Sequence, residues 1–335
     1  NTTLDASTTG TVTVDSTAKT TATANMLGVA AGAVAINGNV GVLDAAGNAA
    51  VSMNAATIQA KDIAAHSKLD GTSTITLNLG AGAAKSATVG AVVGWGGFGY
   101  SSIAGSNTLK LDNSNLHAEQ TIAMDAVNDL AASVNVAALS VGFVTGAIQI
   151  SEADASATAS VTIGSKNTLQ AGNDKKDGTA ADKGSIQIQA KNAPKLTTHS
   201  GIELIGLGVT GGVIKSMTQV GSSKKDMETS LTVQDGNQFT AAVVDLDASA
   251  EAVETADFHA PDAAKPPQNV GVASLQVNYN GAADYSTVKV DVASAQYGDA
   301  KKSKTVDTLT INGANSVIQN IAAQSNSGGL TGITN

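Results

Sequence analysis

The chain has 335 residues, a net charge of −9 and only 14% charged residues, and all nineteen of its basic residues are lysines. This balance excludes a general electrostatic attraction to nucleic acid or anionic lipid, and the lack of arginine argues against bidentate recognition of phosphate or guanine. The sequence contains no cysteine, which excludes disulfides, thiolate metal sites and cysteine nucleophiles. Aromatic residues make up only 3%, a composition that fits a narrow tube lined by Val, Ile, Ala and Leu better than a compact globule.

A glycine-centred apolar segment returns five times along the chain. The central glycines are separated by 62, 52, 66 and 63 residues, and such near-constant spacing is the signature of a repeat array. The pattern therefore predicts a solenoid. The five segments are Leu27-Gly28-Val29, Val89-Gly90-Ala91, Val141-Gly142-Phe143, Leu207-Gly208-Val209 and Val270-Gly271-Val272.

Between these segments the dominant pattern is period-two alternation of apolar and polar residues, which predicts strands with one apolar face. Helical periodicity is weak, and its best candidate covers residues 248–258. Because a coil of a parallel β-helix usually takes about 20–25 residues, a period near sixty predicts two or three coils per repeat. About fourteen coils would then form a rod on the order of 65 Å long. The Asn-Gly pairs at 37–38, 280–281 and 312–313 are expected to form turns at the corners of the coils.

The predicted architecture is one continuous all-β solenoid over residues 1–335. Both ends fall within repeat material, so we expect a segment of a longer protein, and the first residues do not form a signal peptide. Charged or proline-rich insertions at 173–184, 258–269 and 297–304 are expected to leave the solenoid as loops. Uncharged windows at 20–43, 86–109 and 130–151 are interpreted as buried strands, not as membrane spans, because glycine and polar residues interrupt them.

Two stretches are candidates for binding. The heptapeptide 94–100 holds the only tryptophan, and Trp95, Phe98 and Tyr100 could form an exposed aromatic platform for a sugar ring or a partner protein. The alternative, which we prefer, is an aromatic plug inside the tube or aromatic stacking between adjacent coils. The second candidate is the charged insertion with Lys175, Lys176 and Asp177, because loops are where variable recognition is expected.

Catalysis and metal binding are not expected. The four histidines, at 66, 117, 199 and 259, have no metal-ligand spacing, and the glycine-rich heptapeptide lacks the aspartates of a calcium-binding repeat. The acidic pairs Glu152/Asp154 and Asp245/Asp247 place two carboxylates on one strand face. Polysaccharide cleavage would need a further acid, or calcium with a strong base, and charges are sparse. No cofactor is implied.

The segments NVAALSVGFVTGAIQISEADASATASV (135–161) and NVGVASLQVNYNGAADYSTVKVDV (269–292) resemble repeats of very large bacterial surface exoproteins. These are the filamentous-haemagglutinin-like adhesins and their leukotoxin-like relatives, and the likeness, carried by composition and period, covers nearly the whole chain. The resemblance implies a right-handed parallel β-helix shaft displayed outside the bacterial cell, where it mediates attachment, aggregation or biofilm formation.

Three hypotheses for function follow from the sequence. The first is an adhesin shaft whose partners are host or bacterial surface proteins or glycans, bound through weak multivalent contacts. The second is a carbohydrate-active β-helix enzyme, which the sparse charges disfavour. The third is a self-assembling filament or surface-layer subunit, associating end to end or laterally, because open solenoid ends expose unpaired strand edges.

Overall fold

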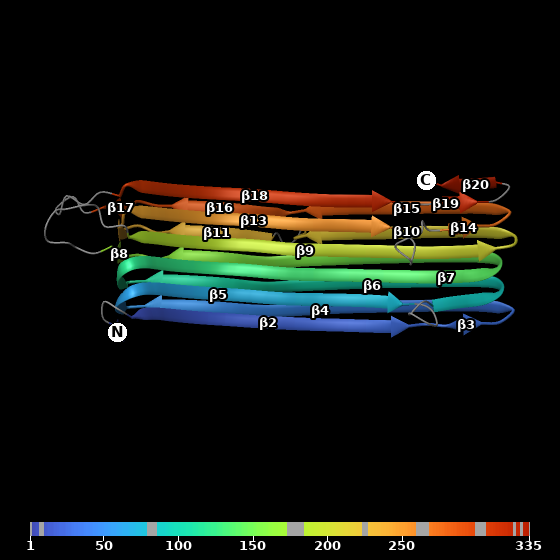
Figure 1. Ribbon diagram of the computed structural model, residues 1–335, viewed down its shortest axis with the longest axis horizontal. Coiled ribbons are helices and arrows are strands. Elements are labelled where there is room, and N and C mark those ends of the chain that lie inside the picture. Colours follow the sequence, from blue (N-terminus) through green and yellow to red (C-terminus); the bar gives the residue numbers. More distant parts are fainter. Residues whose placement is uncertain are drawn as a thin grey trace.

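The computed structural model describes residues 2–6, 10–78, 86–172, 184–222, 227–258, 268–298, 306–323, 326–328 and 331–334. This part of the chain is all-β, with no helix, and its strands pair into a parallel sheet (Figure 1). The described residues contain no helix able to span a membrane. The segment 248–258, where helical periodicity is strongest although weak, lies in a strand.

The strands are very long, because alternation continues through stretches without a turn residue. Their bounds are β1 (Thr2–Asp5), β2 (Thr11–Leu27), β3 (Ala30–Ala31), β4 (Val34–Asn54), β5 (Ala56–Asn78), β6 (Ser86–Asp112), β7 (Asn115–Ile163), β8 (Thr168–Ala171), β9 (Ser185–Gly206), β10 (Val209–Val220), β11 (Met227–Val233), β12 (Gln238–Thr240), β13 (Val243–Phe258), β14 (Gln268–Val270), β15 (Ala273–Asp284), β16 (Ser286–Val292), β17 (Gln296–Tyr297), β18 (Thr308–Ala323), β19 (Asn326–Gly328) and β20 (Thr331–Thr334).

Strands that pair with one another are separated along the chain by about the same number of residues as successive glycine-centred segments. One inward-facing column of paired residues runs Val12, Ile63, Ile122, Ile186, Val244 and Leu309, with steps of 51, 59, 64, 58 and 65 residues. A single turn of the chain therefore takes about sixty residues. Our expectation of two or three coils in that length, and of fourteen coils in all, is wrong. Each turn contains two long strand segments where we expected several short ones.

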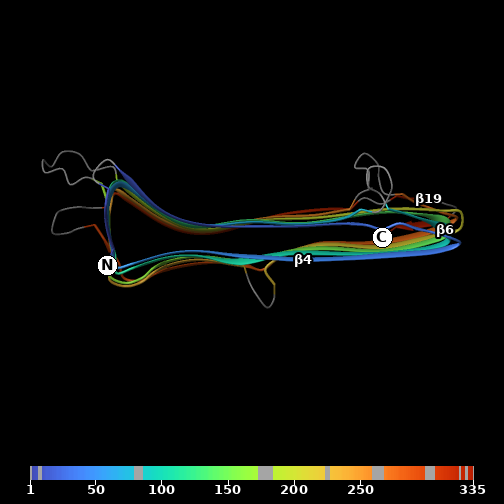
Figure 2. The same cartoon turned by 90° about the horizontal axis from the view of Figure 1, so that it is seen from below.

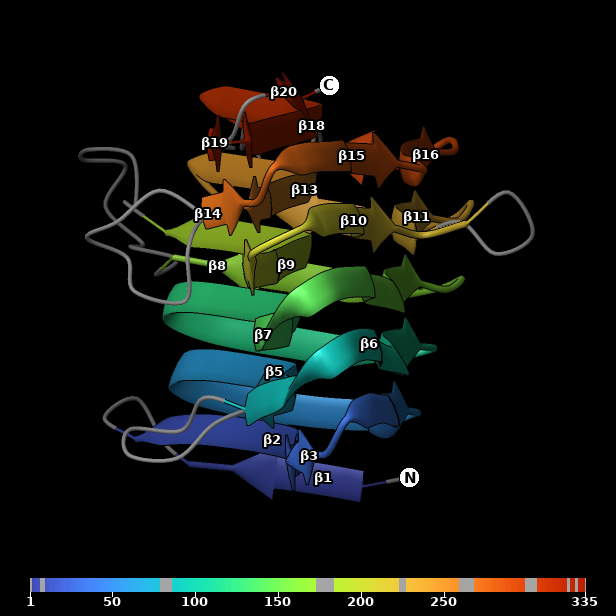
Figure 3. The ribbon, with the colours of Figure 1, turned by 90° about the vertical axis from the view of Figure 1, so that its right-hand side faces the viewer.

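The turns stack into two facing layers. One layer holds β2, β5, the first half of β7, β9, β13 and β18; the other holds β4, β6, the second half of β7, β10 with β11, and β15 with β16. Figure 2 shows the layers further apart at the left-hand end than in the middle, and Figure 3 looks along the strands. The winding is consistent with a β-solenoid.

The glycine-centred segments lie on top of one another at the right-hand end of Figure 1. Gly90 pairs with Gly142 in parallel register. The amide of Leu207 donates to the carbonyl of Gly142 at 3.1 Å, and the amide of Ala273 donates to the carbonyl of Gly208 at 3.2 Å. From Gly90 onward, successive glycine-centred segments are thus parallel neighbours, as their spacing predicts. The first segment is offset, because Ala31 pairs with Val89 and so Gly32, not Gly28, lies beside Gly90.

Glycine is required at this bend because neighbouring backbones approach closely. A Cβ added at Gly142 would lie 2.5 Å from the carbonyl oxygen of Gly90, whereas one added at Gly96 would meet nothing within 4 Å. We expect Gly142→Ala to lower the free energy of unfolding by about 1–3 kcal/mol through overpacking. The matched change Gly96→Ala should be neutral or stabilising by up to about 1 kcal/mol. Equilibrium urea unfolding of both variants measures the difference, and equal stabilities would contradict the stacking.

The core between the layers falls into two clusters. One occupies the bend where β8 and β17 lie and includes Ile63, Leu111 and Phe239; the other continues along the layers and includes Leu69, Leu130 and Phe258. All six side chains are almost fully buried. Apolar burial along both layers therefore supplies the main stabilisation of the stacked turns.

The bend after β4, β6 and β7 is built by residues in the left-handed region. Ala55, Asn113 and Lys166 have φ of 52°, 48° and 61°, and Gly236 occupies the next equivalent place at 77°. The Asn-Gly pairs at 37–38, 280–281 and 312–313 instead lie inside β4, β15 and β18, so predicting turns there is wrong. These glycines lie within extended strands and do not turn the chain.

The three insertions fall largely outside the described residues. Of the segment 173–184 only Gly184 is described, and of 258–269 only Phe258, which ends β13, and residues 268–269, which begin β14. The segment 297–304 is described only at Tyr297 and Gly298. The prediction that these segments form loops stays a prediction.

Candidate functional site: an outer apolar face

The structure does not bring the predicted aromatic residues onto one face. Trp95 points inward, is 4% exposed and belongs to the second core cluster, as our preferred alternative proposed. Phe98 and Tyr100 occupy outward positions of β6 and are half-buried. A shared aromatic platform is therefore absent from this heptapeptide. Lys175, Lys176 and Asp177 lie outside the described residues.

The two acidic pairs lie on opposite layers. Glu152 and Asp154 are on the outer surface of β7, where Glu152 accepts from Lys215 Nζ at 2.5 Å and Asp154 accepts from the Tyr100 hydroxyl at 2.7 Å. Asp247, on β13, accepts from Gln189 and Asn312. The carboxylates of the two pairs do not converge on a common point, and each of these three carboxylates is already engaged by neighbouring side chains.

Burial raises the pKa of Asp154, while its hydrogen bond from Tyr100 opposes that shift. Burial and the neighbouring Asp154 also raise the pKa of Tyr100. Since the folded state binds a proton at Asp154 more readily than the unfolded state, stability falls as pH rises through this pKa. We expect Asp154→Asn to raise the melting temperature at pH 7 and to have no such effect well below pH ~4, near the usual aspartate pKa. A pH series of thermal melts tests this, and an equal difference at all pH values would contradict it.

Two of the described histidines lie beside aspartate side chains. His66 Nδ1 lies 2.6 Å from Asp125 Oδ2 on the adjacent strand, and His199 Nδ1 lies 4.0 Å from Asp257. His259 is outside the described residues. Within the part of the chain that the structure describes, no three histidine or acidic side chains gather into a group that could hold a metal ion.

A surface that we did not predict lies on the second layer, next to the glycine bend. Every second residue of five neighbouring strand segments points outward here, and most of these residues are apolar. We call this surface the outer apolar face. It consists of the outward positions 34–40 of β4, 92–98 of β6, 144–150 of β7, 209–215 of β10 and 273–279 of β15.

Large aliphatic side chains on the outer apolar face are well exposed. Ile36 is 78% exposed, Ile148 56%, and Leu275 50%. Of the twenty outward positions only Lys215 is charged, and it is paired with Glu152. Contiguous apolar surface of this kind usually marks an interaction site.

The inner side of the same strand segments is mixed: apolar residues such as Val93, Trp95 and Ile214 are buried there beside polar ones. Asn37, Thr145, Gln149, Thr210 and Gln276 point between the layers, each with a buried side-chain atom that has no hydrogen-bond partner among the described residues. The inner side is thus more polar here than in the first layer, where apolar residues such as Ile122 and Leu130 point inward. The large aliphatic side chains of these segments lie mostly on the outward side.

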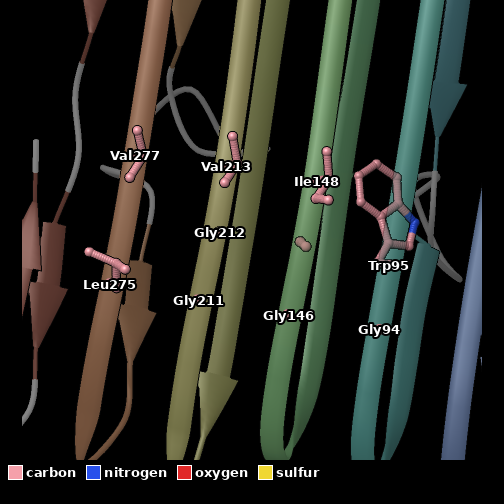
Figure 4. Close-up of a pocket in the computed structure, with 10 residues that line it drawn as sticks. Gly94, Trp95, Gly146, Ile148, Gly211, Gly212, Val213, Leu275 and Val277 are labelled. Atoms are coloured by element: carbon pink, nitrogen blue, oxygen red, sulfur yellow. The ribbon is translucent and has the colours of Figure 1, made fainter.

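A shallow pocket of about 430 Å³ lies on the outer apolar face (Figure 4). Two rows of outward residues cross the strands at this pocket, two residues apart. The glycine row is Ile36, Gly94, Gly146, Gly211 and Leu275; the aliphatic row is Gly38, Gly96, Ile148, Val213 and Val277. The three central glycines form a trough beside a ridge made by Ile148, Val213 and Val277.

The first layer carries a different groove, of about 580 Å³, on its outer surface. It is lined by Lys68, Lys191 and Lys195 together with Asp129 and Glu251. Lys191 pairs with Glu251 at 2.8 Å and Lys195 lies 3.8 Å from Asp129. Most of its charge is therefore neutralised within the protein, which makes the outer apolar face the stronger candidate site.

Comparison with family models, with curated proteins and with solved structures returned no match to this chain. Function is therefore argued from the geometry above.

Proposed function

We propose that the chain is a right-handed parallel β-helix segment from the shaft of an extracellular bacterial adhesin of the filamentous-haemagglutinin-like kind, without catalytic activity. The observation that supports this most is the parallel register carried from Val12 to Leu309. In the described residues the long strands of each turn pair in register with those of the next, so added turns would extend one stiff body, which is what a shaft requires.

The proposed shaft acts through repeated weak contacts. Its outer surfaces present ladders of short polar side chains, such as Thr23, Thr74, Ser133, Thr197 and Thr255 along one column. Individually such contacts are weak, but many copies on one cell bind together, and linkage raises the overall avidity by about 10²–10⁴.

Binding to surface glycans and host matrix proteins tests the adhesive function. Beads coated densely with the chain should bind defined members of a glycan and matrix-protein array, while the same chain free in solution should bind much more weakly. Beads coated with heat-unfolded chain provide the control. Absence of binding to every array member at saturating bead density would contradict the adhesive function.

A specific observation also favours the second candidate, a filament that grows end to end. Among the described strands β18 pairs only with β13, and its inward residues Leu309, Ile311 and Ile321 are 42%, 48% and 51% exposed. Continuing the register into a second copy would place Val12 and Val14 of that copy over Leu309 and Ile311, apolar on apolar. Unpaired edges of this kind template further pairing.

Sedimentation velocity separates the two candidates. If copies stack end to end, the wild-type chain should form a series of oligomers, and Ile311→Lys should abolish the series because the charge would be buried at the junction. Thr310→Lys, on the outward side of the same strand, is the matched control and should leave assembly intact. Equal assembly of both variants would contradict the end-to-end contact.

A further inference from the structure

The outer apolar face exposes a contiguous apolar surface, and its shape indicates which kind of partner packs against it. We propose that it is the interface of a symmetric dimer, in which a second copy of this chain packs its own outer apolar face against the first. This lateral contact is independent of the adhesive function and of end-to-end stacking, because it uses outward side chains and neither the loops nor the unpaired backbone edges of β2, β4 and β18.

These strand segments carry large aliphatic side chains on their outward side and several polar side chains on their inner side. Ile148 and Val213 face solvent while Gln149 and Thr210 are buried between the layers. A sheet with one apolar side is normally packed on that side. Since Lys215 already has a partner in Glu152, covering the face would not leave an unpaired charge buried.

Four glycines of the outer apolar face are not required by packing within the chain. A Cβ added at Gly94, Gly146 or Gly211 would meet its nearest neighbour at 3.7, 3.9 and 3.8 Å, and one at Gly96 would meet nothing within 4 Å. None of these four has a positive φ. Glycine weakens a strand interior and often marks a place where another backbone or a ligand approaches closely. The approach here must come from outside the chain.

The outer apolar face is complementary in shape to a second copy of itself. A two-fold axis along the stacking direction, midway between the two rows, superposes the glycine row of one copy on the aliphatic row of the other. Ile148 and Val213 then lie over Gly146 and Gly211 of the second copy, and Ile36 lies over Gly38. Three of the five strand positions therefore place a large side chain opposite a glycine. An isologous contact of this kind is the usual way in which soluble proteins dimerise.

The size of the face is sufficient for such a dimer. Four outward rows spaced at about 6.6 Å, across five strands about 4.8 Å apart, cover roughly 600 Å² on each copy. The pair would bury about 1,200 Å², at the lower end of specific, stable interfaces. The layers run nearly flat in this half of the molecule (Figure 2), which lets two copies approach along the whole face.

The experiment compares three glycine variants of the full 335-residue chain by sedimentation velocity over a concentration series. The wild type should show a monomer–dimer equilibrium. Gly146→Val and Gly211→Val fill the trough and should weaken dimerisation by at least about tenfold. Their melting temperatures at low protein concentration should be equal to or above that of the wild type, because valine is the better strand former at an open position.

Gly96→Val is the matched control. In the dimer Gly96 lies opposite Gly94 of the second copy, where a gap remains, so this variant should dimerise at least as well as the wild type. Ile311→Lys, at the open edge, should also leave the dimer unchanged. A control that behaves like Gly146→Val would overturn the two-fold arrangement.

A monomeric wild type at every concentration would overturn the dimer itself. In that case flotation with phosphatidylcholine vesicles identifies the other apolar occupant. If the wild-type chain floats with the vesicles and the Ile148→Asp variant does not, the outer apolar face binds lipid. If neither floats, the face has no lipid affinity, and the dimer proposal still fails.

Discussion

Replacing Phe239 by alanine is expected to lower the free energy of unfolding by about 3–5 kcal/mol, the usual cost of emptying a buried aromatic site. Phe239 is fully buried in the first core cluster and stacks on Tyr297 with ring centroids 5.4 Å apart and planes 14° apart. The short strand that holds it, β12, pairs with β8 on one side and β17 on the other. Loss of the ring would therefore loosen three successive turns at one bend.

The measurement is the urea midpoint and slope of equilibrium unfolding. Phe143→Ala is the control, because Phe143 is 59% exposed at the opposite bend. We expect this variant to lose about 1 kcal/mol or less. If the two phenylalanines proved equally important, the bend at β12 would not be a packed part of the core.

The second large effect is expected at a chain of buried asparagines between the layers. Asn192 accepts from Asn128 Nδ2 at 2.5 Å and donates from Nδ2 to the carbonyl of Glu228 and the hydroxyl of Thr229, both at 2.8 Å. Asn192→Ala would leave these groups without their partner in a dry environment. We expect a loss of about 2–4 kcal/mol in the free energy of unfolding.

A double-mutant cycle isolates this interaction. Asn128→Ala combined with Asn192→Ala should lower the free energy of unfolding by clearly less than the sum of the two single changes. The second change no longer leaves a buried side chain without its hydrogen-bond partner. Asn315, in the same column on the open strand β18, is exposed. Asn315→Ala should therefore change stability by about 0.5 kcal/mol or less. Strict additivity within the cycle would contradict a buried, coupled ladder.

The sequence identified which segments stack but not how long a turn is. Period-two alternation marks strands and their faces, and the spacing of the glycine segments sets the distance between neighbouring turns. Neither reports how many strands fill that distance. The positions of the bends were hard to predict, because Asn-Gly pairs were the expected signal. Instead, Ala55, Asn113 and Lys166 adopt positive φ at the bends. Those pairs lie inside long strands.

The candidate site was missed because we treated apolar alternation as pointing inward everywhere. The needed signal is a change of phase within β7. Between Val144 and Ile150 the larger apolar residues hold the even positions, and between Ala153 and Ile163 the odd positions carry the apolar side. Along β7 the apolar residues change from even to odd positions. Because the strand continues without a turn, one of these two sets of apolar side chains must point to the solvent. Which partner covers it depends on shape, and sequence alone does not give shape.

The most direct test of the whole account is the length of one turn. The chain has no cysteine, so spin labels can be placed on Thr74→Cys paired with Ser133→Cys, two outward residues in register whose hydroxyls lie 3.2 Å apart. Strong dipolar broadening of the electron paramagnetic resonance spectrum is expected for this pair. Thr74→Cys with Phe98→Cys, the spacing of a coil of about 24 residues, should show none. Broadening in the second pair and not in the first would contradict a turn of about sixty residues and the faces built on it.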